Sequence, residues 1–163
     1  MPWKRLVTTE FLRHAGEQGR MVFLKDTCCD YELVRERQAA VNGTPLKIYN
    51  ANAQSWFDSC CHGAAGYSGV MANFHPDLYK WAFDHKDTDY EKARLVADFL
   101  TAAAMIEMRI YPCNAKYYQQ KYAVPMSTFA RSADRAKLDK NAMGEVESLR
   151  HLEEYVRQQI GLK

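Results

Sequence analysis

Before Pro76, the hydrophobic and polar positions of the chain alternate between short apolar runs and amphipathic stretches. Residues 21–25 are apolar without interruption up to the final lysine, so we expect a strand that is buried on both faces. Further strands are expected at residues 45–49 and 66–71. Helices are expected from Thr8 or Thr9 to Gly19, from Asp30 to Asn42, and from Ser55 to Cys61. This alternation of strands and helices indicates βα units and a parallel sheet.

Beyond Pro76 the apolar positions follow helical spacing alone, so we expect the rest of the chain to be helical. The expected helices start near Leu78, at Tyr90, at Ala115 after a break at Pro112, and before Val146, and the last one ends at Gly161. No low-complexity linker separates the two halves. We divide the chain into residues 1–88, which contain the βα units, and residues 89–163, which form the helical region.

The number of strands is small for an α/β fold of this pattern. The chain has 163 residues, whereas an eight-stranded α/β barrel takes roughly 250. Three parallel strands cannot close a barrel, and they leave two unpaired sheet edges. The pattern also begins with a helix that no strand precedes. We therefore expect the chain to form part of a larger α/β structure.

Composition and charge exclude several classes of protein. The apolar content of 47% and aromatic content of 12% are those of a globular chain. A net charge of +2, with both signs interspersed, gives no reason to expect nucleic acid or an acidic membrane surface as a partner. No apolar run approaches the roughly 20 residues that span a bilayer. Five cysteines, four of them in adjacent pairs, favour a reducing, cytoplasmic location.

Lys25 carries the clearest chemical signal. It ends an expected strand, and α/β barrels place their active-site residues at the C-terminal ends of strands. A lysine attacks a ketone only as the neutral amine, and apolar surroundings favour that form. The imine that forms with a 2-oxo acid is an electron sink for making or breaking a carbon–carbon bond. The alternative without function is a lysine that simply extends its amine into water.

Three segments, in order and spacing, resemble the dihydrodipicolinate synthase and N-acetylneuraminate lyase family. Phe23-Leu24-Lys25-Asp26-Thr27 is similar to the end of the family's sixth barrel strand. Residues 63–76, a glycine-rich run that passes through Ala-Asn to a proline, resemble its eighth strand. Residues 111–116, Tyr-Pro-Cys-Asn-Ala-Lys, resemble the segment that opens its C-terminal helices.

The resemblance implies both a fold and an activity. The fold is α/β, the C-terminal part of a (β/α)8 TIM barrel (about strands six to eight) followed by a C-terminal helical region. The activity is that of a Schiff-base (class I) aldolase, a lyase that acts on pyruvate or a related 2-oxo acid and uses no cofactor. By this resemblance Lys25 is the catalytic nucleophile, and the substrate-binding residues are Thr27, Asn50, Ser68 and Asn73. Asn50 departs from the Ser-Gly-Asp of many members, which leaves the second substrate open.

The resemblance also implies that essential groups lie elsewhere. In the family, the proton-transferring tyrosine and the segment that binds the pyruvate carboxylate belong to earlier strands. Proton transfer and positioning each contribute orders of magnitude to a rate. We therefore expect little turnover from this chain alone, and as its partner either further copies in a homo-oligomer or a complementing N-terminal half.

Two other interpretations compete with catalysis. The chain could be a non-catalytic relative that serves as an oligomerisation or assembly module, burying its sheet edges against another chain. The cysteine pairs, with His62 beside Cys61, could suggest a metal site. Zinc ligands usually come as Cys-x₂₋₄-Cys, because adjacent cysteines point apart, so we expect no metal.

Overall fold

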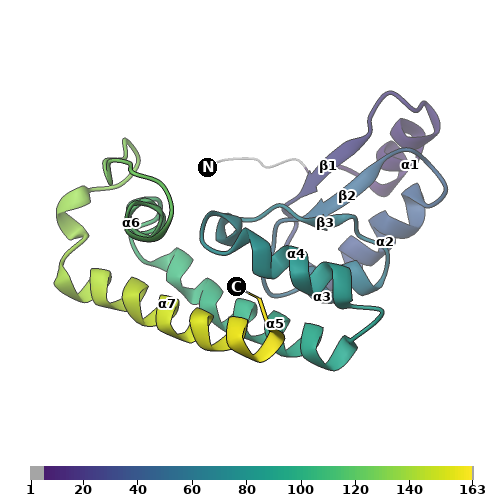
Figure 1. The fold of residues 1–163 in the computed structure, drawn as a ribbon. Helices are drawn as coiled ribbons and strands as arrows, with labels where there is room; N and C mark the ends of the chain where they lie inside the picture. The colour runs from purple at the N-terminus through teal and green to yellow at the C-terminus, as the bar shows by residue number, and fades with distance from the viewer. Residues whose placement is uncertain (1–5, 163) are drawn as a thin grey trace. The chain divides into compact units, whose positions relative to one another are not determined.

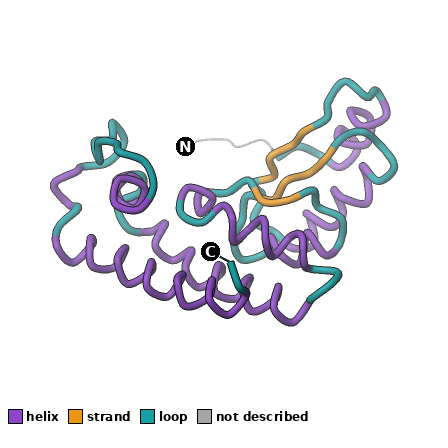
Figure 2. Tube along the Cα trace, viewed as in Figure 1, coloured by secondary structure: helices purple, strands orange, loops and turns teal. Residues whose placement is uncertain are grey.

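A computed structural model describes residues 6–162, which divide into two compact units with the break between Gly69 and Val70. Over the described residues the fold is α/β, with seven α-helices and one parallel sheet of three strands. The strands all belong to the first unit, and the described part of the second unit is helical (Figures 1 and 2). This confirms the expected change of character along the chain.

The elements of the first unit alternate as expected. They are α1 (Thr9–Glu17), β1 (Phe23–Asp26), α2 (Tyr31–Val41), β2 (Lys47–Asn50), α3 (Trp56–Cys61) and β3 (Gly66–Tyr67). The strands lie side by side in the order β1-β2-β3, all parallel. In this register Lys25 lies opposite Tyr49, and Asn50 lies opposite Tyr67.

Local side chains explain where the first helices begin. The Thr8 hydroxyl accepts a hydrogen bond from the backbone N–H of Phe11 at 3.2 Å and caps α1. The Asp30 carboxylate does the same for α2, at 2.9 Å from the backbone nitrogen of Leu33. Both caps satisfy N–H groups that a helix cannot pair internally.

One face of the sheet carries the core of the first unit. Leu12 and Ala15 of α1 pack with Val41 of α2 against Ile48 of β2, and Leu24 of β1 joins them. These apolar side chains meet because residues 24 and 48 point to the same face of the parallel sheet. Helices α1 and α2 therefore cover this face.

The opposite face of β1 is open in the described chain. Phe23 is 52% exposed and stacks on Tyr49 with ring centroids 4.7 Å apart. The expectation of a strand buried on both faces is therefore wrong, and Met21 and Val22 precede the strand instead of forming its start. The apolar run does not alternate, so its pattern could not show that helices cover one face only.

The third strand is shorter than expected. It ends at Tyr67, and the chain continues as a short 3-10 helix, η1 (Val70–Asn73). Gly69 marks the change of direction. A Cβ atom there would lie 2.1 Å from the Tyr67 hydroxyl and 2.5 Å from the backbone oxygen of Ala51, so no larger residue fits without movement. The expected strand through residue 71 is therefore wrong.

The second unit contains the remaining helices. They are α4 (Pro76–His85), α5 (Tyr90–Ala103), η2 (Ala104–Met108), α6 (Cys113–Tyr122), η3 (Arg135–Lys137) and α7 (Lys140–Ile160). Helix α7 begins before the expected apolar stripe, because Asp139 caps it by accepting from the backbone nitrogen of Ala142 at 2.9 Å. It ends as expected at Gly161, whose φ of +69° suits glycine.

A buried carboxylate, Glu153 of α7, links this helix to α6 and to His75, the residue before α4. His75 Nδ1 lies 3.3 Å from Glu153 Oε2, and the Tyr118 hydroxyl donates to the same oxygen. Arg150 Nη1 and Arg157 Nε donate to Oε1 at 3.0 and 2.9 Å. Burial by itself raises the pKa of Glu153, but these partners outweigh it and lower the pKa to about 2. Glu153 is therefore charged in the folded unit.

Candidate active site

The three parallel strands end on the same side of the sheet, and three of the expected site residues lie at these C-terminal ends, with Lys25 and Asn50 on opposite faces. Lys25 is the penultimate residue of β1, Asn50 ends β2, and Ser68 follows β3 directly. The backbone N–H of Ser68 donates to the backbone oxygen of Asn50 at 2.8 Å, so the two segments remain paired beyond the end of β3. Parallel strands present their C-terminal ends on one side, which is where α/β folds bind ligands.

Lys25 projects from the open face of the sheet. It lies opposite Tyr49 in register, on the same face as Phe23, and it is exposed. The apolar surroundings that we expected for its amine are therefore not provided by the described residues. What the fold does provide is an amine held on a strand, where its backbone position is fixed and its side chain is accessible.

The residue after Lys25 is held by a buried ion pair. Arg37 Nη1 lies 2.8 and 2.9 Å from the two carboxylate oxygens of Asp26, and both side chains are almost fully buried. Asp26 Oδ1 also accepts from the backbone nitrogen of Cys28 at 2.9 Å, and Arg37 Nη2 donates to the backbone oxygen of Val7 at 2.7 Å. The pair thus fixes the turn that follows β1.

Our sequence reasoning missed this ion pair, although a signal for it exists. Arg37 lies between Val34 and Val41 on the face of α2 that is buried, at the three- and four-residue spacing of an apolar stripe. A charged residue at such a position needs a buried partner of opposite charge. Asp26 is that partner, at the end of the adjacent strand.

Thr27 lines a cavity together with Lys25. The cavity has a volume of about 220 Å³, and Asp26, Cys28 and Arg37 contribute to its wall. Burial raises the pKa of the Cys28 thiol, and the neighbouring Asp26 raises it further. Cys28 therefore stays a neutral thiol at pH 7.

Asn50 is directed into the protein. Its amide nitrogen donates to the hydroxyls of Ser55 and Ser59 at 3.0 and 3.1 Å, and its oxygen accepts from the backbone nitrogen of Asn52 at 2.8 Å. The residue is 1% exposed. Asn50 therefore shapes the turn between β2 and α3. Direct substrate contact by Asn50 stays a prediction, and it would require one of these bonds to be exchanged.

Asn73 belongs to the second unit, at the end of η1. Its amide nitrogen donates to the backbone oxygen of Val70 at 2.9 Å and lies 3.4 Å from the hydroxyl of Tyr111. Gln119 donates to the backbone oxygen of Asn73 at 2.6 Å. Asn73 and Tyr111 line a cavity of about 270 Å³ within this unit. Two of the resembling segments, residues 63–76 and 111–116, thus meet at Asn73.

No helix among residues 6–162 has the length and apolarity that a membrane crossing requires. Within the same residues, no three His, Cys, Asp or Glu side chains gather as ligands for a metal ion.

The fold of the described residues is similar to solved structures of one family. A putative dihydrodipicolinate synthase from Thermus thermophilus matches with a TM-score of 0.73 and 17% identity, over 91% of this chain and 53% of that chain. A prophage protein of the dihydrodipicolinic acid synthase family from E. coli K12, in complex with pyruvate, matches with a TM-score of 0.75 and 18% identity, over 96% and 52%. The dihydrodipicolinate synthase from Thermotoga maritima matches with a TM-score of 0.68 and 18% identity, over 95% and 51%.

These matches concern the fold. The chain spans about half the length of each solved structure, and its three-stranded sheet and helices match the C-terminal half of dihydrodipicolinate synthase-like proteins. The resemblance seen in the sequence is thus confirmed at the level of the fold. No protein-family profile and no curated protein matches the chain.

Proposed function

We propose that this chain carries the nucleophile of a Schiff-base lyase that acts on pyruvate or a related 2-oxo acid. The observation that supports this most is the position of Lys25, an accessible amine at the C-terminal end of a parallel strand in a dihydrodipicolinate synthase-like fold. A solved structure with this fold is a complex with pyruvate.

In the proposed reaction, the neutral amine of Lys25 adds to the ketone carbon of the 2-oxo acid, and the adduct loses water to form an imine. Protonated at nitrogen, the imine withdraws electrons from the neighbouring carbon, so a carbon–carbon bond there can form or break. By resemblance, Thr27, Asn50 and Ser68 would line the substrate's path, and substrate contact by Asn73 stays a prediction. The buried pair of Asp26 and Arg37 would hold the turn after Lys25 in place.

The complete site would need groups that the described residues do not supply. We propose that residues 1–88 contribute the last three βα units of a TIM barrel and residues 89–163 its helical region. The acid–base and carboxylate-binding groups would then come from the rest of the barrel, either a complementing N-terminal half or its equivalent in an oligomer. A cytoplasmic location would suit such an enzyme.

Borohydride trapping tests the nucleophile directly. The purified chain is incubated with pyruvate and cyanoborohydride, and its intact mass is measured. We expect the mass of the chain to increase by one carboxyethyl group, which is what reduction of a pyruvate imine leaves on a lysine. Peptide mapping should place this group on Lys25. The Lys25→Arg variant should form none, because arginine keeps the charge but forms no imine.

Lys47 offers a matched control. It is exposed and lies on the same sheet face as Lys25, at the opposite end of the neighbouring strand. The Lys47→Arg variant should keep the adduct. Equal labelling of Lys25 and Lys47, or no adduct at all, would argue against a reactive amine at Lys25.

An assembly module is the second candidate, and a specific observation favours it. Phe23 on the open face of β1 is 52% exposed, and Val22, just before the strand, is 60% exposed. Unpaired strand edges and exposed apolar surface usually mark a site of association. If Lys25 forms no adduct while the chain self-associates through β1, this second function takes precedence.

A further inference from the structure

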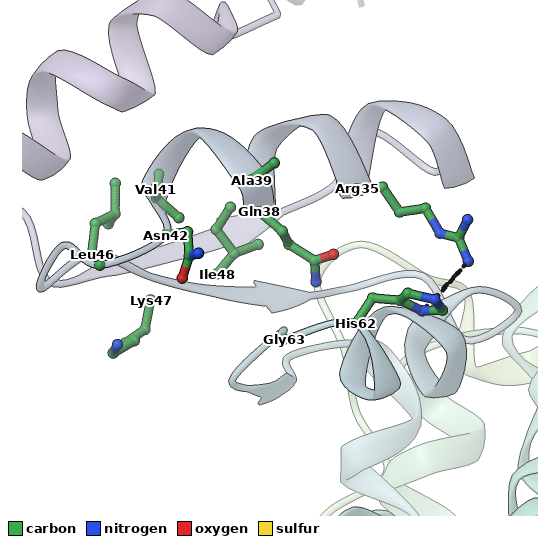
Figure 3. Close-up of a pocket in the computed structure, with 11 residues that line it drawn as sticks. Arg35, Gln38, Ala39, Val41, Asn42, Leu46, Lys47, Ile48, His62 and Gly63 are labelled. Carbon is green, nitrogen blue, oxygen red and sulfur yellow. Dashed lines mark hydrogen bonds between the residues drawn. The ribbon is translucent and has the colours of Figure 1, made fainter.

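A second cavity of the first unit lies between α2, β2 and the end of α3 (Figure 3). Its volume of about 360 Å³ falls within the range of roughly 300–1,000 Å³ that is usual for small-molecule sites. Arg35 and Gln38 of α2, Ile48 of β2 and His62 after α3 contribute to its wall. It shares no lining residue with the cavity at Lys25.

Gln38 lines this cavity and has an unused hydrogen-bond acceptor that is closed off from solvent. The residue is 8% exposed, and its amide nitrogen donates to the backbone oxygen of Ser59 at 2.9 Å. That bond fixes which end of the amide is the oxygen. Gln38 Oε1 is buried and has no hydrogen-bond partner among the described residues. Because buried acceptors are nearly always paired, a donor from a bound molecule is the expected complement.

Arg35 and His62 form the outer wall of the cavity, joined by the contact drawn in Figure 3. Arg35 Nη2 lies 3.0 Å from His62 Nε2, and His62 Nδ1 lies 2.7 Å from the backbone oxygen of Asp58. The ring of His62 thus lies between the Asp58 backbone and the guanidinium, which it holds in place.

The guanidinium of Arg35 is only loosely paired with a carboxylate. Its Nη2 lies 3.4 Å from Asp58 Oδ1, longer than the roughly 2.7–2.9 Å of a strong charge-assisted bond. The Arg35 side chain is 42% exposed, and no carboxylate is among the described residues that line the cavity. Lys47 also borders it, but its side chain points away from α2 in Figure 3. The cavity thus offers a cation at its rim and an acceptor at its base.

We propose that this cavity binds a small organic anion that also carries hydroxyl groups. Its anionic group pairs with Arg35, and one hydroxyl donates to Gln38 Oε1. The apolar side chains of Leu46 and Ile48 cover the carbon skeleton of such a molecule. This site is independent of imine formation at Lys25, because the two cavities share no residue.

Three probes separate the two recognition elements. The full chain is titrated with glucose 6-phosphate, with glucose and with inorganic phosphate, by calorimetry and by amide chemical shifts. Glucose 6-phosphate has both the anion and the hydroxyls, so we expect it to bind at least about tenfold more tightly than either other probe. The shifted amides should lie at residues 35–43 and 62–63.

Two variants assign the contacts. Arg35→Gln should weaken glucose 6-phosphate binding to the level of glucose. Gln38→Met should weaken it to the level of inorganic phosphate while phosphate binding itself persists, which also shows that the variant is folded. Arg13→Gln, at an exposed position of α1 outside the cavity, should bind all three probes as the unmodified chain does.

Three results would overturn the proposal. One is that none of the probes binds in the millimolar range. Another is that glucose 6-phosphate and inorganic phosphate bind equally, which would make Gln38 irrelevant. The third is that Arg35→Gln and Arg13→Gln behave alike, which would reduce any binding to general attraction by surface charge.

Discussion

Asp26 and Arg37 form a buried ion pair directly behind Lys25. The fold has enclosed both charges, and each depends on the other for its counter-charge. Arg37 further ties the start of the first unit to α2 through the backbone oxygen of Val7. At the residue scale, the position of Lys25 therefore depends on the buried ion pair that follows it.

Removing one partner should be costly. We expect Arg37→Met to destabilise the first unit by about 3–5 kcal/mol, because a buried carboxylate is left unpaired. Urea unfolding measured by circular dichroism gives this value. Replacing both partners, Asp26→Leu with Arg37→Met, should cost less than the single change. Arg13→Met, at an exposed position, should change stability by no more than about 0.5 kcal/mol. A small effect of Arg37→Met would mean that Asp26 finds another partner.

At the scale of elements, the turn after β3 shows how one glycine directs the chain. Tyr67 and Ala51 leave no room for a side chain at Gly69. Gly144, inside α7, has open space where its Cβ would be. A side chain added at Gly69 would therefore clash, whereas one added at Gly144 would not.

We expect Gly69→Ala to destabilise the protein by about 1–3 kcal/mol, since the backbone oxygen of Ala51 cannot move aside as easily as a flexible side chain. Gly144→Ala should instead stabilise it by about 0.5–1 kcal/mol, because alanine favours the helix. Thermal unfolding of both variants measures the difference. If both alanines act in the same direction, the tight packing at Gly69 is not real.

A second element-scale prediction concerns acid. The ordinary pKa of glutamate is 4.5, whereas that of Glu153 in the folded unit is about 2. Between these values the unfolded chain binds more protons, so stability is complete above pH 4.5 and is lost as the pH falls towards 2. The loss from this residue should be on the order of 3 kcal/mol.

Denaturant unfolding from acid to near-neutral pH tests this. Glu153→Gln should be less stable near neutral pH and should show a shallower decline in acid. Glu154→Gln, its exposed neighbour on α7, should retain the slope of the unmodified protein. A steep decline that persists in Glu153→Gln would assign the acid sensitivity to other carboxylates.

Much of the order of helices and strands could be predicted from the sequence, because helix boundaries are set by local residues. Thr8, Asp30 and Gly161 are local signals, and each marks a helix boundary that the structure confirms. The exposure of Phe23 and the internal bonds of Asn50 depend instead on which elements cover the sheet. The pattern of apolar and polar residues along the chain does not show which elements cover each face of the sheet. The role of Lys25 and the boundary after residue 88 stay predictions.

At the scale of the whole molecule, the chain spans about half the length of the solved structures that share its fold. Its sheet keeps an edge at β1 with Val22 and Phe23 exposed. We expect the chain to associate through this edge, with further copies or with a complementing chain. Sedimentation should show species larger than a monomer.

Val22→Lys should shift that distribution towards the monomer, because a lysine at a strand edge discourages pairing. Phe11→Lys, at a similarly exposed apolar position of α1, should leave it unchanged. An unmodified chain that sediments as a monomer at all concentrations would contradict the expected association.

The open face around Lys25 has a consequence for selectivity. An amine that bulk solvent reaches can react with any small aldehyde or ketone, and an imine formed there is exposed to hydrolysis. Enclosure is what lengthens the lifetime of such an intermediate and restricts which carbonyl compounds arrive. If Lys25 reacts as proposed, whatever covers this face would control which carbonyl compounds reach it, even without contributing a catalytic group.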